Sequence, residues 1–254
     1  MNRKTFLLFF VAVVSIPLFS AVTTGNTLCR IKVESSTRDT LISLPLVDVG
    51  ASGDSINITK IVLTDNLSDG DTLMAKVDGR WQTWDLNGKV WEGRSTVNGD
   101  ETTVASSNES FSRGTTIILT RKGEDLTKPI YLYGEFKNES KTQTPVAEGW
   151  TLMGNALPAD FPINKEGFWT ANGGSPSVGD QIVVPASTGL GVKEYTWGSV
   201  VDGEFGWVAL TMQKDANGIL VATKELTRDQ VPAGQGFWYR SVGESVPTVT
   251  WNNL

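Results

Sequence analysis

The stretch from Val77 to Trp91 reads VDGRWQTWDLNGKVW, and it decides the fold class of the chain. Strand-forming residues alternate with polar ones between Arg80 and Leu86, which is the period of a β-strand. Asp78-Gly79 precedes this run and Asn87-Gly88 follows it. Such dipeptides supply the positive φ angles that two-residue hairpin turns need. The stretch therefore predicts antiparallel strands joined by tight turns.

The same signals recur along the chain. Further turn dipeptides stand at Asn98-Gly99, Asp202-Gly203 and Asn217-Gly218. A helical pattern is confined to one turn at Thr227–Gln230. We therefore predict an all-β protein of antiparallel meanders or sandwiches. The expected strands are Cys29–Val33, Thr40–Val47, Ile58–Leu63, Thr72–Val77, Arg80–Leu86, Thr115–Arg121, Pro129–Phe136, Gln181–Val184, Val192–Val201, Phe205–Gln213, Ile219–Leu226, Gly236–Val242 and Val246–Trp251.

The two halves of the chain carry these signals in the same order, which indicates an internal duplication. The matched segments are Thr40-Leu-Ile-Ser with Thr151-Leu-Met-Gly, Asp69-Gly-Asp-Thr-Leu with Val178-Gly-Asp-Gln-Ile, Trp84 with Trp197, and Trp91 with Trp207. We expect one β module over 22–136 and a second over 150–254, joined by a polar linker over 137–149. The sequence leaves open whether the modules are separate sandwiches or one continuous body.

The N-terminus has the order of a secretory signal peptide. Arg3 and Lys4 are followed by the apolar run Phe6–Phe19 and then by small residues. The run is too short to span a bilayer, which takes ~20 residues. We expect cleavage after Ala21, a signal peptide over 1–21, and export to the periplasm, the cell surface or the extracellular space. No later run approaches membrane length, so we expect no span in the mature chain.

The composition excludes several classes of activity. The 254 residues include no His, so catalysis that depends on His and zinc sites that contain His are ruled out. The formal charge of −6 argues against a nucleic-acid partner. A single cysteine, Cys29, cannot form an internal disulfide, although an intermolecular bridge is open to it. No pattern predicts a cofactor.

A resemblance rests on Gly149-Trp-Thr-Leu-Met-Gly-Asn-Ala-Leu-Pro and the later Val231-Pro-Ala-Gly-Gln-Gly-Phe-Trp. These segments resemble a "W-L-x-G-N-P-x-P … P-A-G-Q-G-F" pattern in β-rich modules of secreted bacterial surface proteins, with Ala156 in place of the usual Pro. The opening Ile31–Val47 resembles the mature start of secreted paralogous proteins of Verrucomicrobia and Lentisphaerae. The resemblance implies an exported all-β protein and brings no catalytic residues with it.

These observations favour a secreted, non-catalytic structural or assembly protein. Its partners would be a second copy of the chain or other envelope proteins, recruited through unpaired edge strands. The runs Cys29–Glu34 and Val246–Trp251 at the two chain ends are the candidates for such pairing. A glycoside hydrolase that uses only carboxylates is a minor alternative.

Carbohydrate binding is the main alternative, because exposed indoles suit sugar rings. The candidate residues are Trp81, Trp84, Trp91, Trp197, Trp207 and Trp238. Trp residues that recur in both halves are also what a core requires, whereas Trp81 has no Trp counterpart and is expected to face solvent. A calcium site at Asp65, Asp69 and Asp71 is a weaker candidate, because Asp and Gly are also the residues that turns prefer.

Overall fold

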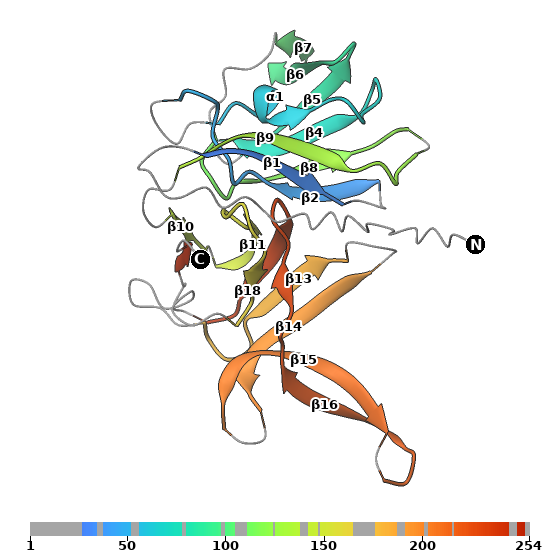
Figure 1. The fold of residues 1–254 in the computed structure, drawn as a ribbon, viewed down its shortest axis with the longest axis vertical. Helices are drawn as coiled ribbons and strands as arrows, with labels where there is room; N and C mark the ends of the chain where they lie inside the picture. Colours follow the sequence, from blue (N-terminus) through green and yellow to red (C-terminus); the bar gives the residue numbers. More distant parts are fainter. Residues whose placement is uncertain are drawn as a thin grey trace, which may run out of the picture.

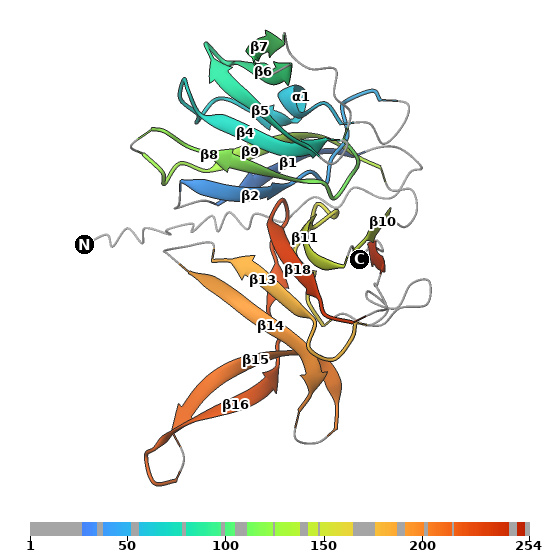
Figure 2. The same ribbon diagram turned by 180° about the vertical axis from the view of Figure 1, so that it is seen from behind.

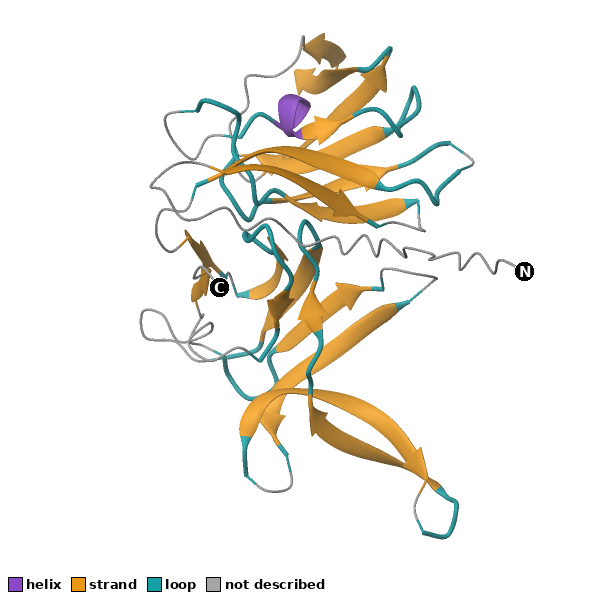
Figure 3. Ribbon diagram, viewed as in Figure 1, coloured by secondary structure: helices purple, strands orange, loops and turns teal. Residues whose placement is uncertain are grey.

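The computed structural model describes residues 27–34, 38–51, 56–77, 80–97, 100–104, 111–123, 125–137, 142–146, 148–164, 176–186, 191–200, 203–214, 216–243 and 248–251. It confirms the all-β prediction, since these residues form antiparallel strands and one four-residue helix, α1 (Ile58–Ile61) (Figure 3). The predicted signal peptide, the turns Asp78-Gly79 and Asn98-Gly99, and Trp169 lie outside the described residues.

The N-terminal half is a sandwich of a six-stranded and a three-stranded sheet (Figure 1). The six-stranded sheet, called the N-terminal sheet, has the order β2 (Asp39–Ser43), β8 (Thr116–Thr120), β4 (Thr72–Val77), β5 (Arg80–Asn87), β6 (Val90–Val97), β7 (Asp100–Val104). The smaller sheet has the order β1 (Thr27–Val33), β9 (Ile130–Phe136), β3 (Val62–Leu63). Ile31 and Leu132 from the smaller sheet and Trp84 from the larger one belong to a single buried cluster, which forms the core between the sheets.

The C-terminal half contains a second six-stranded sheet, called the C-terminal sheet. Its order is β11 (Gly149–Gly154), β18 (Gly236–Ser241), β13 (Gln181–Pro185), β14 (Val192–Ser199), β15 (Phe205–Lys214), β16 (Leu220–Leu226). Two short pairs of strands complete this half: β10 (Thr142–Pro145) with β19 (Thr248–Trp251), and β12 (Phe161–Pro162) with β17 (Gln230–Val231). Phe161 and Trp251 from these pairs are buried with Phe237 of the C-terminal sheet.

The two six-stranded sheets have the same topology. If each sheet's strands are numbered in chain order, both sheets read first, sixth, second, third, fourth, fifth. In each sheet a buried aspartate also directly precedes the second strand. Asp71 accepts hydrogen bonds from the backbone N–H groups of Ser68 and Lys122 at 2.9 and 2.7 Å. The structural equivalent of Asp71 is Asp180, which accepts from Ser177 and Val242 at 2.9 and 2.8 Å. This equivalence is what an internal duplication predicts.

The halves meet through equivalent pairs of residues. Ser43 and Thr116 are cross-strand partners on β2 and β8, and Gly154 and Gly236 are cross-strand partners on β11 and β18. A Cβ atom on Gly154 would collide with the Ser43 side chain, and one on Gly236 with the methyl group of Thr116. Since Ser43 is equivalent to Gly154 and Thr116 to Gly236, the contact has the form of an isologous interface within one chain.

Hydrogen bonds connect the halves around this contact. The Ser43 hydroxyl donates to the carbonyl of Asn155 at 2.7 Å, and the Gln235 amide donates to the carbonyl of Leu41 at 3.1 Å. Asn155 is fully buried, and its amide donates to the carbonyls of Ala159 and Val231. The Gly-Asn and Gly-Gln-Gly segments, singled out as a motif in the sequence, therefore build the junction between the halves.

Three local predictions were wrong. The expected strand Ile58–Leu63 begins as the helical turn α1, because the Asn57 side chain accepts from the N–H of Thr59 and caps the turn. Part of the predicted linker is strand β10, which pairs with β19. The predicted turn at Thr227–Gln230 is not helical, and its last residue starts β17.

The hairpin between β5 and β6 differs from the prediction by one residue. Asn87 pairs with Val90, so the two central residues are Gly88 and Lys89, which both have positive φ angles of 55° and 72°. Positive φ at both central positions is the conformation of a type I′ turn.

Candidate functional site

Three of the predicted sugar-binding tryptophans belong to the core. Trp84, Trp91 and Trp207 are at most 1% exposed, so no face of these indoles is open to a sugar. Trp197 is half-buried and packs edge-on against Trp207, with ring centroids 5.4 Å apart. Carbohydrate binding through Trp84, Trp91 and Trp207 is therefore ruled out for the folded chain, and Trp197 packs beside the core of the C-terminal half.

Strand register corrects one of the predicted matches between the halves. Leu73, two residues after Asp71, pairs with Trp84, and Ile182, two residues after Asp180, pairs with Tyr195. The equivalent of Trp84 is therefore Tyr195 and not Trp197, so the Thr-Trp pairs of the two halves are two residues out of register. Two residues further along, Leu86 is equivalent to Trp197; Trp91 pairs with Leu86 and Trp207 pairs with Trp197, so Trp91 and Trp207 are equivalent, as predicted.

The two remaining candidates lie on outward faces. Trp81 on β5 is 49% exposed, as its lack of a Trp counterpart predicted. Trp238 on β18 is half-buried and contacts Trp150 of β11, which is 53% exposed and was not among the candidates. Nothing in the sequence marked Trp150 as a candidate, because its segment, Gly149-Trp-Thr-Leu-Met-Gly, indicated only the family resemblance.

The candidate calcium ligands are turn residues. The buried carboxylate of Asp71 binds two backbone N–H groups, and Asp69 accepts from the N–H of Gly88 at 3.0 Å. Within the described part of the chain no group of three or more acidic or cysteine side chains is placed to hold a metal ion. Asp65, Asp69 and Asp71 therefore do not form the predicted site, since backbone N–H groups bind the buried carboxylate of Asp71 and the exposed carboxylate of Asp69.

Neither of the chain-end strands proposed for assembly is unpaired. All seven residues of β1 pair with β9, and all four residues of β19 pair with β10. Ile31, Val249 and Trp251 are buried in the cores. Donation of either strand to another molecule would break these pairs and expose apolar side chains. Among the described strands β1 and β19 each pair on one side only, so assembly through their outer edges stays a prediction.

A different edge is open at the far end of the C-terminal sheet. Strands β15 and β16 run past the rest of the sheet as a two-stranded ribbon, the projecting ribbon, which points away from the body in both views (Figures 1 and 2). Among the described strands only β15 pairs with β16, so the outer edge of β16 is free. Edge strands of this kind are ready templates for pairing with another chain.

The projecting ribbon has one apolar and one polar face. Register places Leu210 opposite Lys224, Met212 opposite Ala222 and Lys214 opposite Leu220 on the first face. Leu210, Met212 and Leu220 are 71%, 63% and 58% exposed. The opposite face carries Thr211 bonded to Thr223, and Gln213 bonded to Glu225. The first face therefore groups three exposed apolar side chains beside Lys214 and Lys224, and grouped exposed apolar side chains are typical of interaction surfaces.

Part of the projecting ribbon was predictable from the sequence. The strands Phe205–Gln213 and Ile219–Leu226 and the Asn217-Gly218 turn between them were predicted, and both runs are rich in apolar residues. Apolar residues on a strand ordinarily indicate a face packed on a core. Only the structure shows that no described element covers the apolar face, because exposure depends on where the neighbouring strands end.

A hollow of about 940 Å³ lies at the root of the ribbon. The Asn164 side chain there bonds to the backbone N–H and carbonyl of Trp207, as a strand partner would. The Asp229 carboxylate accepts from the Tyr195 hydroxyl at 2.7 Å and lies 3.2 Å from the Lys193 ammonium. The Tyr195 hydrogen bond holds the pKa of Asp229 below its ordinary value, assisted by Lys193. A carboxylate held ionised is unsuited to the general-acid role in glycoside hydrolysis.

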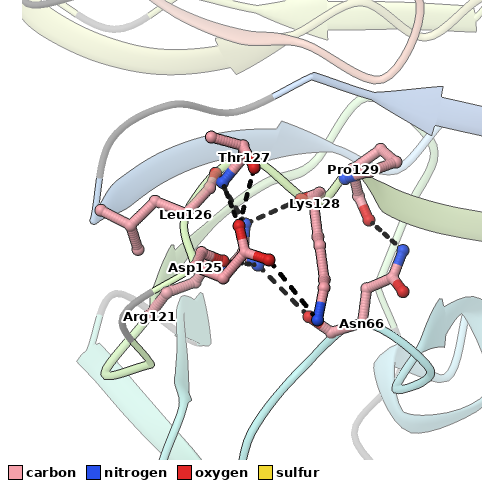
Figure 4. A network of polar contacts seen from close by, with 7 residues as sticks. All are labelled: Asn66, Arg121, Asp125, Leu126, Thr127, Lys128 and Pro129. Atoms are coloured by element: carbon pink, nitrogen blue, oxygen red, sulfur yellow. Dashed lines mark hydrogen bonds and ion pairs between the residues drawn. The ribbon is translucent and has the colours of Figure 1, made fainter.

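A polar network in the N-terminal half is also structural (Figure 4). Arg121 is 3% exposed, and its guanidinium donates to four backbone carbonyls at 2.8 to 3.2 Å. Asp125 accepts from the N–H and hydroxyl of Thr127, which lowers the pKa of the Asp125 carboxyl. Every donor of the network that Figure 4 draws binds within the loop or to Asn66, so the cluster holds the loop before β9 in place.

No family model, curated protein or solved structure matches this chain. The one helix among the described residues, α1, is four residues long, and no described helix has the length and apolar character to cross a membrane.

Proposed function

We propose that the protein is an exported, non-catalytic structural protein that assembles by pairing strand β16 of one copy with β16 of a second copy. The observation that carries this proposal is the projecting ribbon, which combines a free edge with an exposed apolar face. The signal-peptide pattern of residues 1–21 supports export, because its order of basic, apolar and small residues is that of secreted chains.

The sequence of β16 favours pairing with itself. In an antiparallel pair with Thr223 opposite Thr223, Leu220 lies opposite Leu226, Val221 opposite Glu225, and Ala222 opposite Lys224. This register sets no like charges opposite each other, and its central Thr–Thr pair is a favourable one. Directly opposite residues lie on the same face of an antiparallel pair, so the register also joins the apolar faces of the two ribbons.

The pairing would satisfy two features that the isolated chain leaves exposed. The outer N–H and C=O groups of β16 would complete a ladder, and Leu220 of one copy would contact Leu226 of the other. The resulting sheet would have twelve strands around a two-fold axis, the commonest symmetry of homo-oligomers. The bonded side chains in the hollow at the ribbon root support a binding role over a catalytic one, because they are engaged in holding strands together.

A charge exchange at position 222 tests this register. Ala222 is exposed and opposite Lys224 in the proposed pair, so Ala222→Lys creates two lysine pairs across the dimer, and Ala222→Glu creates two ion pairs. Each cross-strand charge pair contributes ~0.2–1 kcal/mol. We expect Ala222→Lys to weaken dimerisation about fivefold and Ala222→Glu to strengthen it to a similar degree, measured by sedimentation equilibrium on the protein without residues 1–21.

The double variant Ala222→Lys/Lys224→Glu is the control, because it restores opposite charges with their positions exchanged. It should dimerise about as well as the original chain. A protein that stays monomeric at every concentration, or that dimerises equally well in all four forms, would show that β16 is not the assembly edge.

A further inference from the structure

A pair of indoles on the outer face of the C-terminal sheet forms an exposed aromatic platform. Trp150 of β11 and Trp238 of β18 lie with ring centroids 6.5 Å apart and planes at 89°. They alternate along their strands with the buried residues Met153, Phe237 and Tyr239, so both point away from the core. More than half of the Trp150 side chain is open to solvent.

A row of polar groups borders this platform. Strand register places Trp150 opposite Arg240, Arg240 opposite Gln181, and Gln181 opposite Thr196. The Arg240 guanidinium lies 5.8 Å from the centroid of the Trp150 ring and donates to the Gln181 side chain at 3.3 Å. A shallow hollow beside Arg240, lined by Glu148 and Val242, leaves room next to the guanidinium.

The charge of Arg240 is not matched within the described residues, since none of their carboxylates forms an ion pair with it. Its one hydrogen bond is to a neutral amide, which uses a single N–H of a five-donor fork. The Trp150 and Gln181 side chains therefore hold the Arg240 guanidinium in place. Its remaining N–H donors are available to the carboxylate of a ligand.

The N-terminal sheet shows that the fold itself does not require these residues. The positions equivalent to Trp150, Trp238 and Arg240 are Asp39, Ile118 and Thr120. There the polar groups bond to each other, since the Thr120 hydroxyl donates to Asp39 at 2.6 Å. Two sheets of equal topology thus differ at this outer face, where the polar groups of one sheet bond to each other and the other sheet presents an indole beside an unmatched cation.

We propose that this face binds a glycan that carries carboxylates, such as a polymer of uronic acid residues. The ring of one sugar would pack its C–H face on Trp150, and its carboxylate would bind the Arg240 guanidinium through two parallel hydrogen bonds. Gln181 and Glu148 would bond to sugar hydroxyls. The site lies on β11, β13 and β18, away from β16, so it does not depend on the proposed dimer.

Calorimetric titration of the protein without residues 1–21 with trigalacturonate tests this site. We expect Trp150→Ala and Arg240→Gln each to weaken binding by about tenfold or more, which corresponds to the loss of one charged hydrogen bond or one stacking contact. Trp81→Ala is the matched control, because it removes an exposed indole from the outer face of the other sheet, and it should leave the affinity unchanged within about twofold.

The neutral trisaccharide of galactose separates stacking from charge recognition, and it should bind at least about tenfold more weakly than trigalacturonate. Arg240→Lys keeps the charge but loses the two-pronged geometry and should give an intermediate affinity. No binding of trigalacturonate, equal binding of the neutral sugar, or equal affinity of the Arg240→Gln variant would each overturn the proposal. All of these side chains are on the surface, so thermal unfolding of each variant should match that of the original chain.

Discussion

At the scale of single residues, two buried carboxylates hold the second strand of each sheet in place. Asp71 and Asp180 are 1% and 0% exposed, and each accepts two backbone N–H groups from segments on either side of a sheet end. Hydrogen bonds to a charged acceptor are stronger than neutral ones. These residues therefore fix the N-terminal ends of β4 and β13 against the segments that follow β8 and β18.

Replacement of either aspartate by asparagine should destabilise its half, because the amide keeps one acceptor oxygen and turns its NH2 group toward the other backbone N–H. We expect Asp71→Asn to cost ~2 kcal/mol in the free energy of unfolding. Asp180→Asn should cost about as much, since the Ser177 N–H and the Tyr239 hydroxyl donate to the same oxygen of Asp180, which the amide oxygen can replace. Urea denaturation of both variants measures these losses, and a loss below ~0.5 kcal/mol for either variant would refute the role of its carboxylate.

Tyr239 also makes stability depend on alkaline pH. Burial raises its pKa above the ordinary value of 10.0, and the hydrogen bond to Asp180 raises it further. The stabilisation is complete below pH 10 and is lost as the pH rises toward the folded-state pKa, because the unfolded chain ionises first. Each such group steepens the decline by up to ~1.4 kcal/mol per pH unit. Tyr239→Phe should show a shallower decline of the free energy of unfolding above pH 10, and an unchanged slope would contradict this.

The Trp and Asp residues show what the sequence could and could not predict. The Asp-Gly-Asp segment identified equivalent positions correctly, because a turn and a buried carboxylate fix its spacing to the strand. Trp84 was matched to the wrong residue, because a β-strand accepts any large side chain at an inward position and here Tyr195 fills the place of an indole. Trp150 was missed because exposure depends on the surrounding sheet and not on the local pattern.

At the scale of elements, the presence of the strands could be predicted from alternating residues and turn dipeptides. Their boundaries and their pairing could not. The run Ile58–Leu63 has the composition of a strand, but the Asn57 cap makes its first residues helical. The segment Thr142–Pro145 looks like a linker by composition and is a strand because β19 returns beside it. Pairing between segments distant in the chain leaves no local signal, so these outcomes required the structure.

The projecting ribbon should contribute little to the stability of the monomer. Leu210 and Met212 are mostly exposed, so replacing both by threonine removes almost no buried apolar area. We expect the double variant to change the free energy of unfolding by less than ~0.5 kcal/mol at concentrations where the chain is monomeric. It should also lower the binding of a hydrophobic dye. A loss of more than ~2 kcal/mol would mean that these side chains pack in the folded monomer.

At the scale of the whole molecule, the two halves are joined by the close approach of four residues. A Cβ on Gly236 would collide with the Thr116 methyl group and lie 2.9 Å from Cβ of Leu41, so Gly236→Ala should cost ~2–3 kcal/mol. Thr116→Ser removes that methyl group and should recover part of the loss. Gly198→Ala is the control, because its Cβ would meet nothing within 4 Å. Calorimetric unfolding distinguishes them, and equal stability of the two alanine variants would refute a tight junction.

The order of strands in the two sheets and the contact between equivalent residues fit a single origin for both halves. The duplication itself stays a prediction from the sequence, and the shared topology and the paired aspartates support it. Features that only one half has then indicate the surfaces that serve a function in that half alone. The projecting ribbon and the Trp150 platform both belong to the C-terminal half.

Disulfide trapping at Thr223 tests the central claim, that β16 pairs with β16 of a second copy. In the proposed register the two Thr223 residues are opposite each other, with Cβ atoms ~5 Å apart, which a disulfide can bridge. In a Cys29→Ala background, Thr223→Cys should form covalent dimers under mild oxidation much faster than the exposed control Glu194→Cys on β14. Equal, slow rates for both cysteines would contradict the assembly through β16.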